Sequence, residues 1–136
     1  MFGNKNKSKL HNHIDTLIGS KTYVTGDINF SGGLRVDGHI SGNIMATEND
    51  HSTLILSDQG TIEGKIQVTN VIINGTVTGP IHADGYLELQ ANAKVFGDVH
   101  YGSMEIQLGA SVDGKLIHQD NPKSEKLVTL ITASPE

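Results

Sequence analysis

Residues 34–44, Leu-Arg-Val-Asp-Gly-His-Ile-Ser-Gly-Asn-Ile, contain the pattern that decides the fold. Within them, Ile40-Ser-Gly42-Asn-Ile44 places an aliphatic residue two positions before and two positions after a glycine. The same phrase occurs six times, and its successive glycines lie 16, 22, 15, 18 and 17 residues apart, at positions 26, 42, 64, 79, 97 and 114. A period of roughly 20 residues or less, rich in β-branched residues, is typical of a solenoid of short strands.

The residues around the six glycines alternate in the way that residues of β-strands do. All twelve positions two before or two after a glycine are aliphatic, and eleven are β-branched. Because strand side chains alternate with a period of two, these positions are predicted to face a common interior. They are Val24, Ile28, Ile40, Ile44, Ile62, Ile66, Val77, Ile81, Val95, Val99, Val112 and Leu116. The glycine itself either bends the backbone at a corner or adopts a positive φ.

A second apolar pair precedes each phrase from the second coil onward, as in Leu34-Arg-Val36 and Leu87-Glu-Leu89. Turn residues such as Asn74-Gly75 separate the apolar segments. One coil of about 17 residues is therefore predicted to hold several strands, each stacked in parallel on its equivalent one coil away. We predict an all-β protein, a parallel β-helix of about six coils over residues 14–118. Residues 1–13 are expected to form a disordered basic tail, and residues 119–136 a flexible C-terminal tail.

Charge and composition exclude several classes of function. The 136 residues include 10 basic and 15 acidic residues, and the single arginine is Arg35. An acidic chain with one arginine and no basic stripe argues against nucleic-acid binding. The chain has no cysteine, so it has neither disulfides nor thiolate metal sites. Because no apolar run approaches a membrane span and no signal peptide is recognisable, we expect a cytoplasmic protein.

The stretch Asp15-Thr-Leu-Ile-Gly19, followed by the phrases around Gly26 and Gly42, resembles the bactofilins, a family of bacterial cytoskeletal proteins. The resemblance continues through the coil series to about Leu116. It implies a right-handed β-helix that polymerises end to end, without nucleotide, into apolar filaments at the inner membrane surface. It also implies that the filament scaffolds cell-wall, cell-shape or polarity proteins. One departure is Val112, where many members have a phenylalanine at an end contact.

The two ends of the predicted solenoid are candidate polymer interfaces. Terminal coils expose unpaired backbone groups and apolar core, and solenoids that stay soluble carry polar caps. No helix-like cap is recognisable before Leu17 or after Leu116. We therefore expect the chain to bind copies of itself, and five residues are candidates for this interface. They are Leu17, Ile18, Val112, Leu116 and Ile117.

The N-terminal segment is a candidate membrane contact. Residues 1–13 hold three lysines and no acidic residue, whereas residues 14–118 have a net charge of −7. An apolar pair would enter the lipid interface while each lysine near anionic lipid contributes about 1 kcal/mol. Such weak anchors are strengthened by the many copies in a polymer. The candidate residues are Met1, Phe2, Lys5, Lys7 and Lys9.

Two motifs suggest chemistry but have simpler interpretations. Residues 109–115 match the first seven places of a phosphate-binding P-loop, but Leu116 stands where Ser or Thr would hold magnesium. His82 and His100 each follow a glycine by three residues on consecutive coils and are expected to stack on the outer surface. Two imidazoles are too few for most metal sites. We expect no catalytic residue, no bound metal and no cofactor.

Two other classes of function remain alternatives at the level of sequence. Ile28, Leu34 and Ile40 lie six residues apart, as in the left-handed hexapeptide-repeat enzymes such as acyltransferases. The residues that follow them are not the small residues of that motif, and the six-residue spacing then ends. A β-helical ligand-binding module would need a flat threonine array, which the mixed outward positions do not provide. A structural protein, and not an enzyme, is therefore the favoured interpretation.

Overall fold

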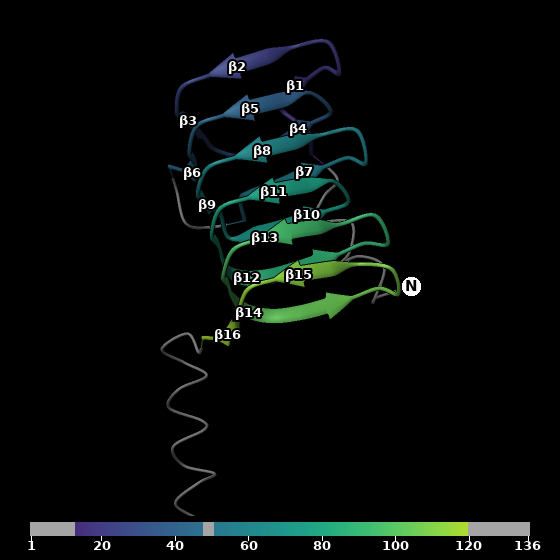
Figure 1. Cartoon of the computed structure of the whole chain (residues 1–136). Helices are drawn as coiled ribbons and strands as arrows, with labels where there is room; N and C mark the ends of the chain where they lie inside the picture. Colours follow the sequence, from purple (N-terminus) through teal and green to yellow (C-terminus); the bar gives the residue numbers. More distant parts are fainter. Residues whose placement is uncertain (1–12, 48–50, 120–136) are drawn as a thin grey trace, which may run out of the picture.

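The computed structural model describes residues 13–47 and 51–119, and every regular element within these ranges is a β-strand. The strands form six stacked coils with three strands to a coil, which together make a column with two open ends (Figure 1). The prediction of an all-β parallel solenoid of about six coils is confirmed.

Each coil has three faces, named here by the order in which the chain passes through them. The first face contains β1 (Thr16–Ile18), β4 (Gly33–Val36), β7 (Thr53–Leu56) and β10 (Asn70–Ile73). The second face contains β2 (Tyr23–Thr25), β5 (His39–Ser41), β8 (Thr61–Glu63), β11 (Thr76–Thr78), β13 (Lys94–Phe96) and β15 (Ser111–Asp113). The third face contains β3 (Ile28–Phe30), β6 (Ile44–Ala46), β9 (Ile66–Gln67) and β16 (Leu116–His118). The longer strands β12 (Ile81–Leu89) and β14 (Val99–Ile106) each turn a corner from the third face of one coil to the first face of the next.

Parallel pairing brings equivalent residues of successive coils into columns. On the second face, for example, Val77 pairs with Ile62 in the coil before and with Val95 in the coil after. The predicted inward positions of the four inner coils, from Ile40 to Val99, are all fully buried. A continuous aliphatic core therefore runs along the axis, and its burial is the main stabilising term.

The repeated glycines stand at the corners between the second and third faces. The structure divides each glycine phrase between two strands, so that β8 ends at Glu63 and β9 begins at Ile66. Gly64 between them has a φ of +153°, a conformation that L side chains rarely adopt. A Cβ at Gly64 would also collide with the carbonyl oxygen of Gly42 in the preceding coil. The glycine thus serves both roles considered from the sequence, and it permits the close stacking of corners as well.

The first strand, β1, begins at Thr16, and the last strand, β16, ends at His118. The predicted N-terminal tail lies outside the described residues except for His13, and the C-terminal tail except for Gln119. That the N-terminal tail is disordered and the C-terminal tail is flexible stays a prediction.

The corner geometry gives a matched pair of glycine variants. Gly64→Ala should destabilise the protein by about 2 kcal/mol or more, because the new methyl group meets the backbone of the preceding coil at an unfavourable φ. Gly19→Ala should change stability by no more than about 0.5 kcal/mol, since a Cβ there has no atom within 4 Å. Urea unfolding followed by circular dichroism compares the two. Equal destabilisation would show that corner stacking does not constrain the glycine.

Candidate polymerisation interface

The first and last coils differ from the others because each is paired on one side only. β1, β2 and β3 form one end of the column, and the second half of β14 with β15 and β16 forms the other (Figure 1). The outer edges of these strands have no neighbouring strand among the described residues. Each end therefore offers backbone N–H and C=O groups to a further parallel strand.

The aliphatic core is open at both ends. At the C-terminal end, Leu116 is 45% exposed and Ile106 is 46% exposed, whereas their equivalents one coil earlier, Val99 and Leu89, are 0% exposed. At the N-terminal end the inward residues are only partly buried, namely Ile18, Val24, Ile28 and Phe30. The core columns would thus continue if another coil were stacked on either end.

The structure separates the five predicted interface residues into two groups. Ile18, Val112 and Leu116 point inward and terminate core columns. Leu17 pairs with the outward residue Arg35, and Ile117 pairs with the outward residue His100. These two side chains therefore lie on the outer rim of the end coils and not on the end surface of the core.

Two exposed side chains of the last coil, Ile106 and Leu108, are not among the interface residues predicted from the sequence. Ile106 closes the same core column as Ile18, and its inward position in the final repeat could have identified it. Leu108 is almost fully exposed in the turn before β15, one coil after Ala91. No repeat pattern marks a turn residue of this kind, so the sequence offered no signal for it.

Residues 13–15, which precede β1, do not close the N-terminal end. The Asp15 N–H donates to the Gly33 carbonyl at 2.8 Å, and the Gly33 N–H donates to Asp15 Oδ2 at 2.9 Å. The carbonyl of His13 lies where a Cβ of Gly33 would stand, which is on the outer side of the second coil. Residues 13–15 thus run beside the solenoid, and no helical cap is present within residues 13–47 and 51–119.

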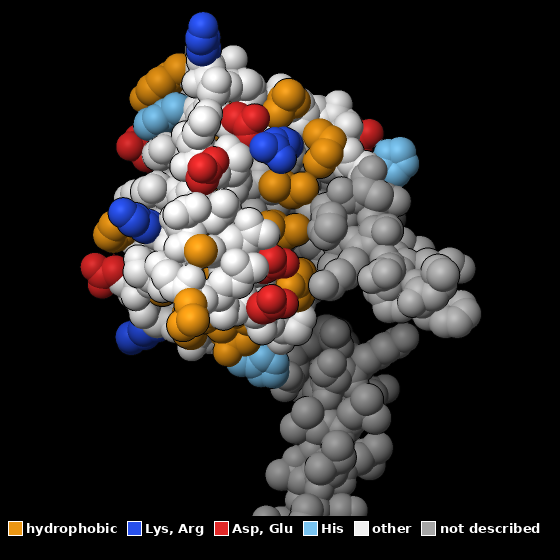
Figure 2. Space-filling view, turned by 90° about the vertical axis from the view of Figure 1, so that its right-hand side faces the viewer, with side chains coloured by type: hydrophobic (Ala, Val, Ile, Leu, Met, Phe, Trp, Pro, Cys, Tyr) orange, Lys and Arg blue, Asp and Glu red, His pale blue; other side chains and the backbone are white. Residues whose placement is uncertain are grey.

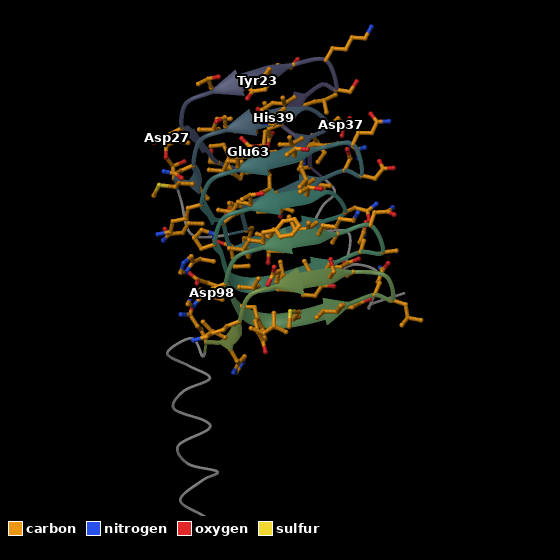
Figure 3. All side chains as sticks on the ribbon, viewed as in Figure 1. Tyr23, Asp27, Asp37, His39, Glu63 and Asp98 are labelled. Atoms are coloured by element: carbon orange, nitrogen blue, oxygen red, sulfur yellow. The ribbon has the colours of Figure 1, made fainter. Side chains whose placement is uncertain are left out.

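Acidic side chains near the glycine corners form hydrogen bonds between coils. Asp27 Oδ1 accepts the Asn43 N–H at 2.9 Å, and Asp98 Oδ1 accepts the Lys115 N–H at 3.0 Å. Figure 3 shows Asp27 and Asp98 along the corner edge of the column. These carboxylates are engaged in holding neighbouring coils together, which is a structural role.

On the second face, Glu63 Oε1 lies 3.5 Å from His39 Nε2 in the next coil toward the N-terminal end. The His39 ring stacks on Tyr23, with ring centroids 4.3 Å apart (Figure 3). Tyr23, His39 and Glu63 are therefore engaged in contacts between coils.

The predicted stacking of His82 on His100 is confirmed. Their ring centroids are 4.2 Å apart and the ring planes differ by 7°. Burial lowers the pKa of His82, the positive charges of His100 and Lys65 lower it further, and Asp84 opposes them. The described ranges contain no group of three or more His, Cys, Asp or Glu side chains that could hold a metal ion.

The stretch that matches part of a P-loop has a different local structure. A P-loop places its glycine-rich turn before a helix, whose N-terminus binds the phosphate. Here Gly109 lies in a turn, β15 follows it, and Gly114 forms the corner that leads into β16. Leu116, where the motif needs a hydroxyl group, terminates a core column.

An open-ended parallel β-solenoid, with an aliphatic core that reaches both ends, is the class of protein that these features define. The chain belongs to the bactofilin family, whose sequence model, described as polymer-forming cytoskeletal, matches residues 16–117. The resemblance noted from the sequence is thereby confirmed. The protein is a member of a structural, cytoskeletal family of polymer-forming proteins.

Two curated relatives support this assignment. The chain is 33% identical to bactofilin BacO of Myxococcus xanthus (strain DK1622) over 102 residues. This aligned region covers 75% of this chain and 78% of BacO. The chain is 28% identical to bactofilin BacP of the same organism over 112 residues. This aligned region covers 82% of this chain and 45% of BacP. No solved structure matches the chain. No helix in the described part of the chain has the length and hydropathy that a membrane span requires.

The open core predicts which substitutions prevent assembly. Leu116→Glu and Ile18→Glu should each reduce sedimentable polymer by about tenfold or more, because stacking would bury an unpaired carboxylate. Thr78→Glu is the matched control, since it adds the same group to an exposed position of a middle coil. All three variants should keep the β-type circular dichroism of the parent. Loss of polymer in Thr78→Glu but not in the end variants would place the interface on the sides of the solenoid.

Proposed function

We infer that the chain stacks end to end, without nucleotide, into filaments that act as a scaffold for cell-shape or cell-wall proteins. The observation that carries this proposal is the aliphatic core that remains open at both ends. Covering one large aliphatic side chain contributes roughly 1.5–3 kcal/mol, and each end presents several of them. Repeated stacking by the ends gives an open filament and not a closed oligomer.

The interactions needed for this assembly are of the same kinds as those that join neighbouring coils within the subunit. Another coil placed on either end would extend the parallel hydrogen bonding and the core columns together, as each inner coil does for its neighbour. Neither the hydrogen bonds nor the apolar contacts involve a phosphate group. The structural character of the bactofilin family favours this proposal over the acyltransferase-like enzyme and the ligand-binding module that the sequence alone also allowed.

End-to-end assembly would leave the sides of the column free for partner proteins. We place the filament in the cytoplasm, at the inner face of the cytoplasmic membrane, with the N-terminal segment as its contact. The residues assigned to this contact, Met1, Phe2, Lys5, Lys7 and Lys9, lie outside the described residues. The support for this part of the proposal is the charge distribution, because the acidic body is repelled by anionic lipid and the lysine-rich segment is attracted.

Flotation with lipid vesicles tests both parts of the proposal. Full-length protein should assemble into filaments in buffer without nucleotide, and these filaments should float with anionic vesicles. Flotation should decrease in high salt, because screening weakens the attraction between the lysines and the lipid. A strict requirement of assembly for ATP or GTP would contradict the proposed mechanism.

Two variants serve as controls for the flotation experiment. Deletion of residues 2–9 should abolish flotation while filaments persist. Leu116→Glu should float poorly in spite of its intact N-terminal segment, since avidity is lost with the polymer. If the deletion variant floats as well as the parent, the membrane contact lies elsewhere or does not exist.

A further inference from the structure

The outer side of the first face contains buried residues that do not belong to the core. In β10, Val71 and Ile73 point inward, so Asn70 and Ile72 point outward. Thr53 of β7 pairs with Asn70 and shares its orientation. The exposed fractions of Thr53, Asn70 and Ile72 are nevertheless 3%, 5% and 6%. A strand whose residues are buried on both sides normally lies beneath a second layer of structure.

This burial is restricted to one face of the column. The outward residue Thr78 of the second face, in the same coil, is exposed, and Gln67 on the third face of the preceding coil is exposed as well. Arg35, which lies two coils earlier in the same column as Ile72, is also exposed. The low exposure of Ile72 is therefore not a general property of outward positions in this solenoid. It indicates a local cover over the first face.

The path of the chain before β1 indicates which segment forms the cover. Gly33 has the outward orientation of Arg35, and the His13 carbonyl occupies the position of its missing Cβ. Gly33 pairs with Thr53, and Thr53 pairs with Asn70. His13, which directly follows residues 1–12 in the chain, therefore lies on the outer side of the first face, in the column of outward positions that continues to Thr53 and Asn70.

Toward the C-terminal end of the column, the first face carries negative charge without a basic partner. Glu88 and Glu105 follow Ile72 in the same outward column. The Tyr86 hydroxyl donates to Glu88 at 2.9 Å, and it lies 3.2 Å from Glu105. Burial and the two carboxylates raise the pKa of Tyr86, so the hydroxyl stays protonated. Neither carboxylate forms an ion pair with a lysine or arginine in the described part of the chain.

We propose that residues 1–12 dock on the outer side of the first face of their own subunit, covering Ile72 and placing lysines beside Glu88 and Glu105. The segment has three lysines, no acidic residue, and apolar side chains at Met1, Phe2 and Leu10. The distance from the second coil to the sixth is roughly 19 Å, which about six extended residues span. The other segments outside the described residues fit less well, since residues 48–50 are Glu-Asn-Asp and residues 120–136 have a net charge of −1.

The absence of cysteine from the chain makes a thiol-labelling test direct. Ile72→Cys in the full-length protein should react slowly with a maleimide, relative to the same variant unfolded in urea. Deletion of residues 2–9 should accelerate this reaction by about tenfold or more, because the covering segment is removed. Thr78→Cys, in the same coil but on the second face, is the matched control. Its labelling rate should be fast and should change by less than about twofold on deletion.

A second deletion and a second cysteine reporter distinguish this docking from its alternatives. Deletion of residues 120–136 should leave the labelling of Ile72→Cys unchanged, and a large acceleration there would identify the C-terminal segment as the cover. If neither deletion changes the rate, Ile72 is buried by its own neighbours and the proposal is wrong. Ile55→Cys, in the same column, provides a second reporter if circular dichroism shows that Ile72→Cys does not fold. Docking on the subunit and contact with lipid are alternative states of this segment, and labelling in the absence of lipid measures the first state alone.

Discussion

The structure depends on the contact of one coil with the next. No strand on the second face is longer than three residues, and every strand pair joins residues of different coils in parallel. A coil therefore has neither a complete set of hydrogen bonds nor a buried core until another coil lies against it. The inner coils have two such neighbours, whereas the first and last have one. Self-assembly is the continuation, between subunits, of the interaction that folds each subunit.

Much of the fold could be predicted from the sequence because the same few constraints act in every coil. A narrow core accepts only aliphatic side chains, and close stacking of corners accepts only glycine, so both leave a periodic signal. The division of each phrase between two strands was less apparent. Ile62 and Ile66 lie four residues apart and both face the core, which is also what one straight strand would show. The positive φ of Gly64, which turns this segment into a corner, has no separate signature in the sequence.

The candidate interface was predictable to a smaller extent. The repeat identified Ile18 and Leu116 because they occupy inward positions of terminal coils. Leu17 is the neighbour of Ile18 in the sequence, but neighbouring residues of a strand face opposite ways, so Leu17 lies on the outer rim. Leu108 lies in a turn, where the periodicity does not extend. The cover over the first face was also not predictable, since Ile72 reads as an ordinary outward residue until its exposure is known.

End-to-end assembly is tested most directly by X-ray diffraction from aligned filaments. If subunits stack by their ends, the strands of all coils lie across the filament and repeat along its axis. End-to-end stacking predicts a reflection at about 4.8 Å on the meridian, parallel to the filament axis. Filaments built by contacts between the sides of the solenoids would place the same reflection on the equator, perpendicular to that axis. An equatorial 4.8 Å reflection would contradict end-to-end assembly.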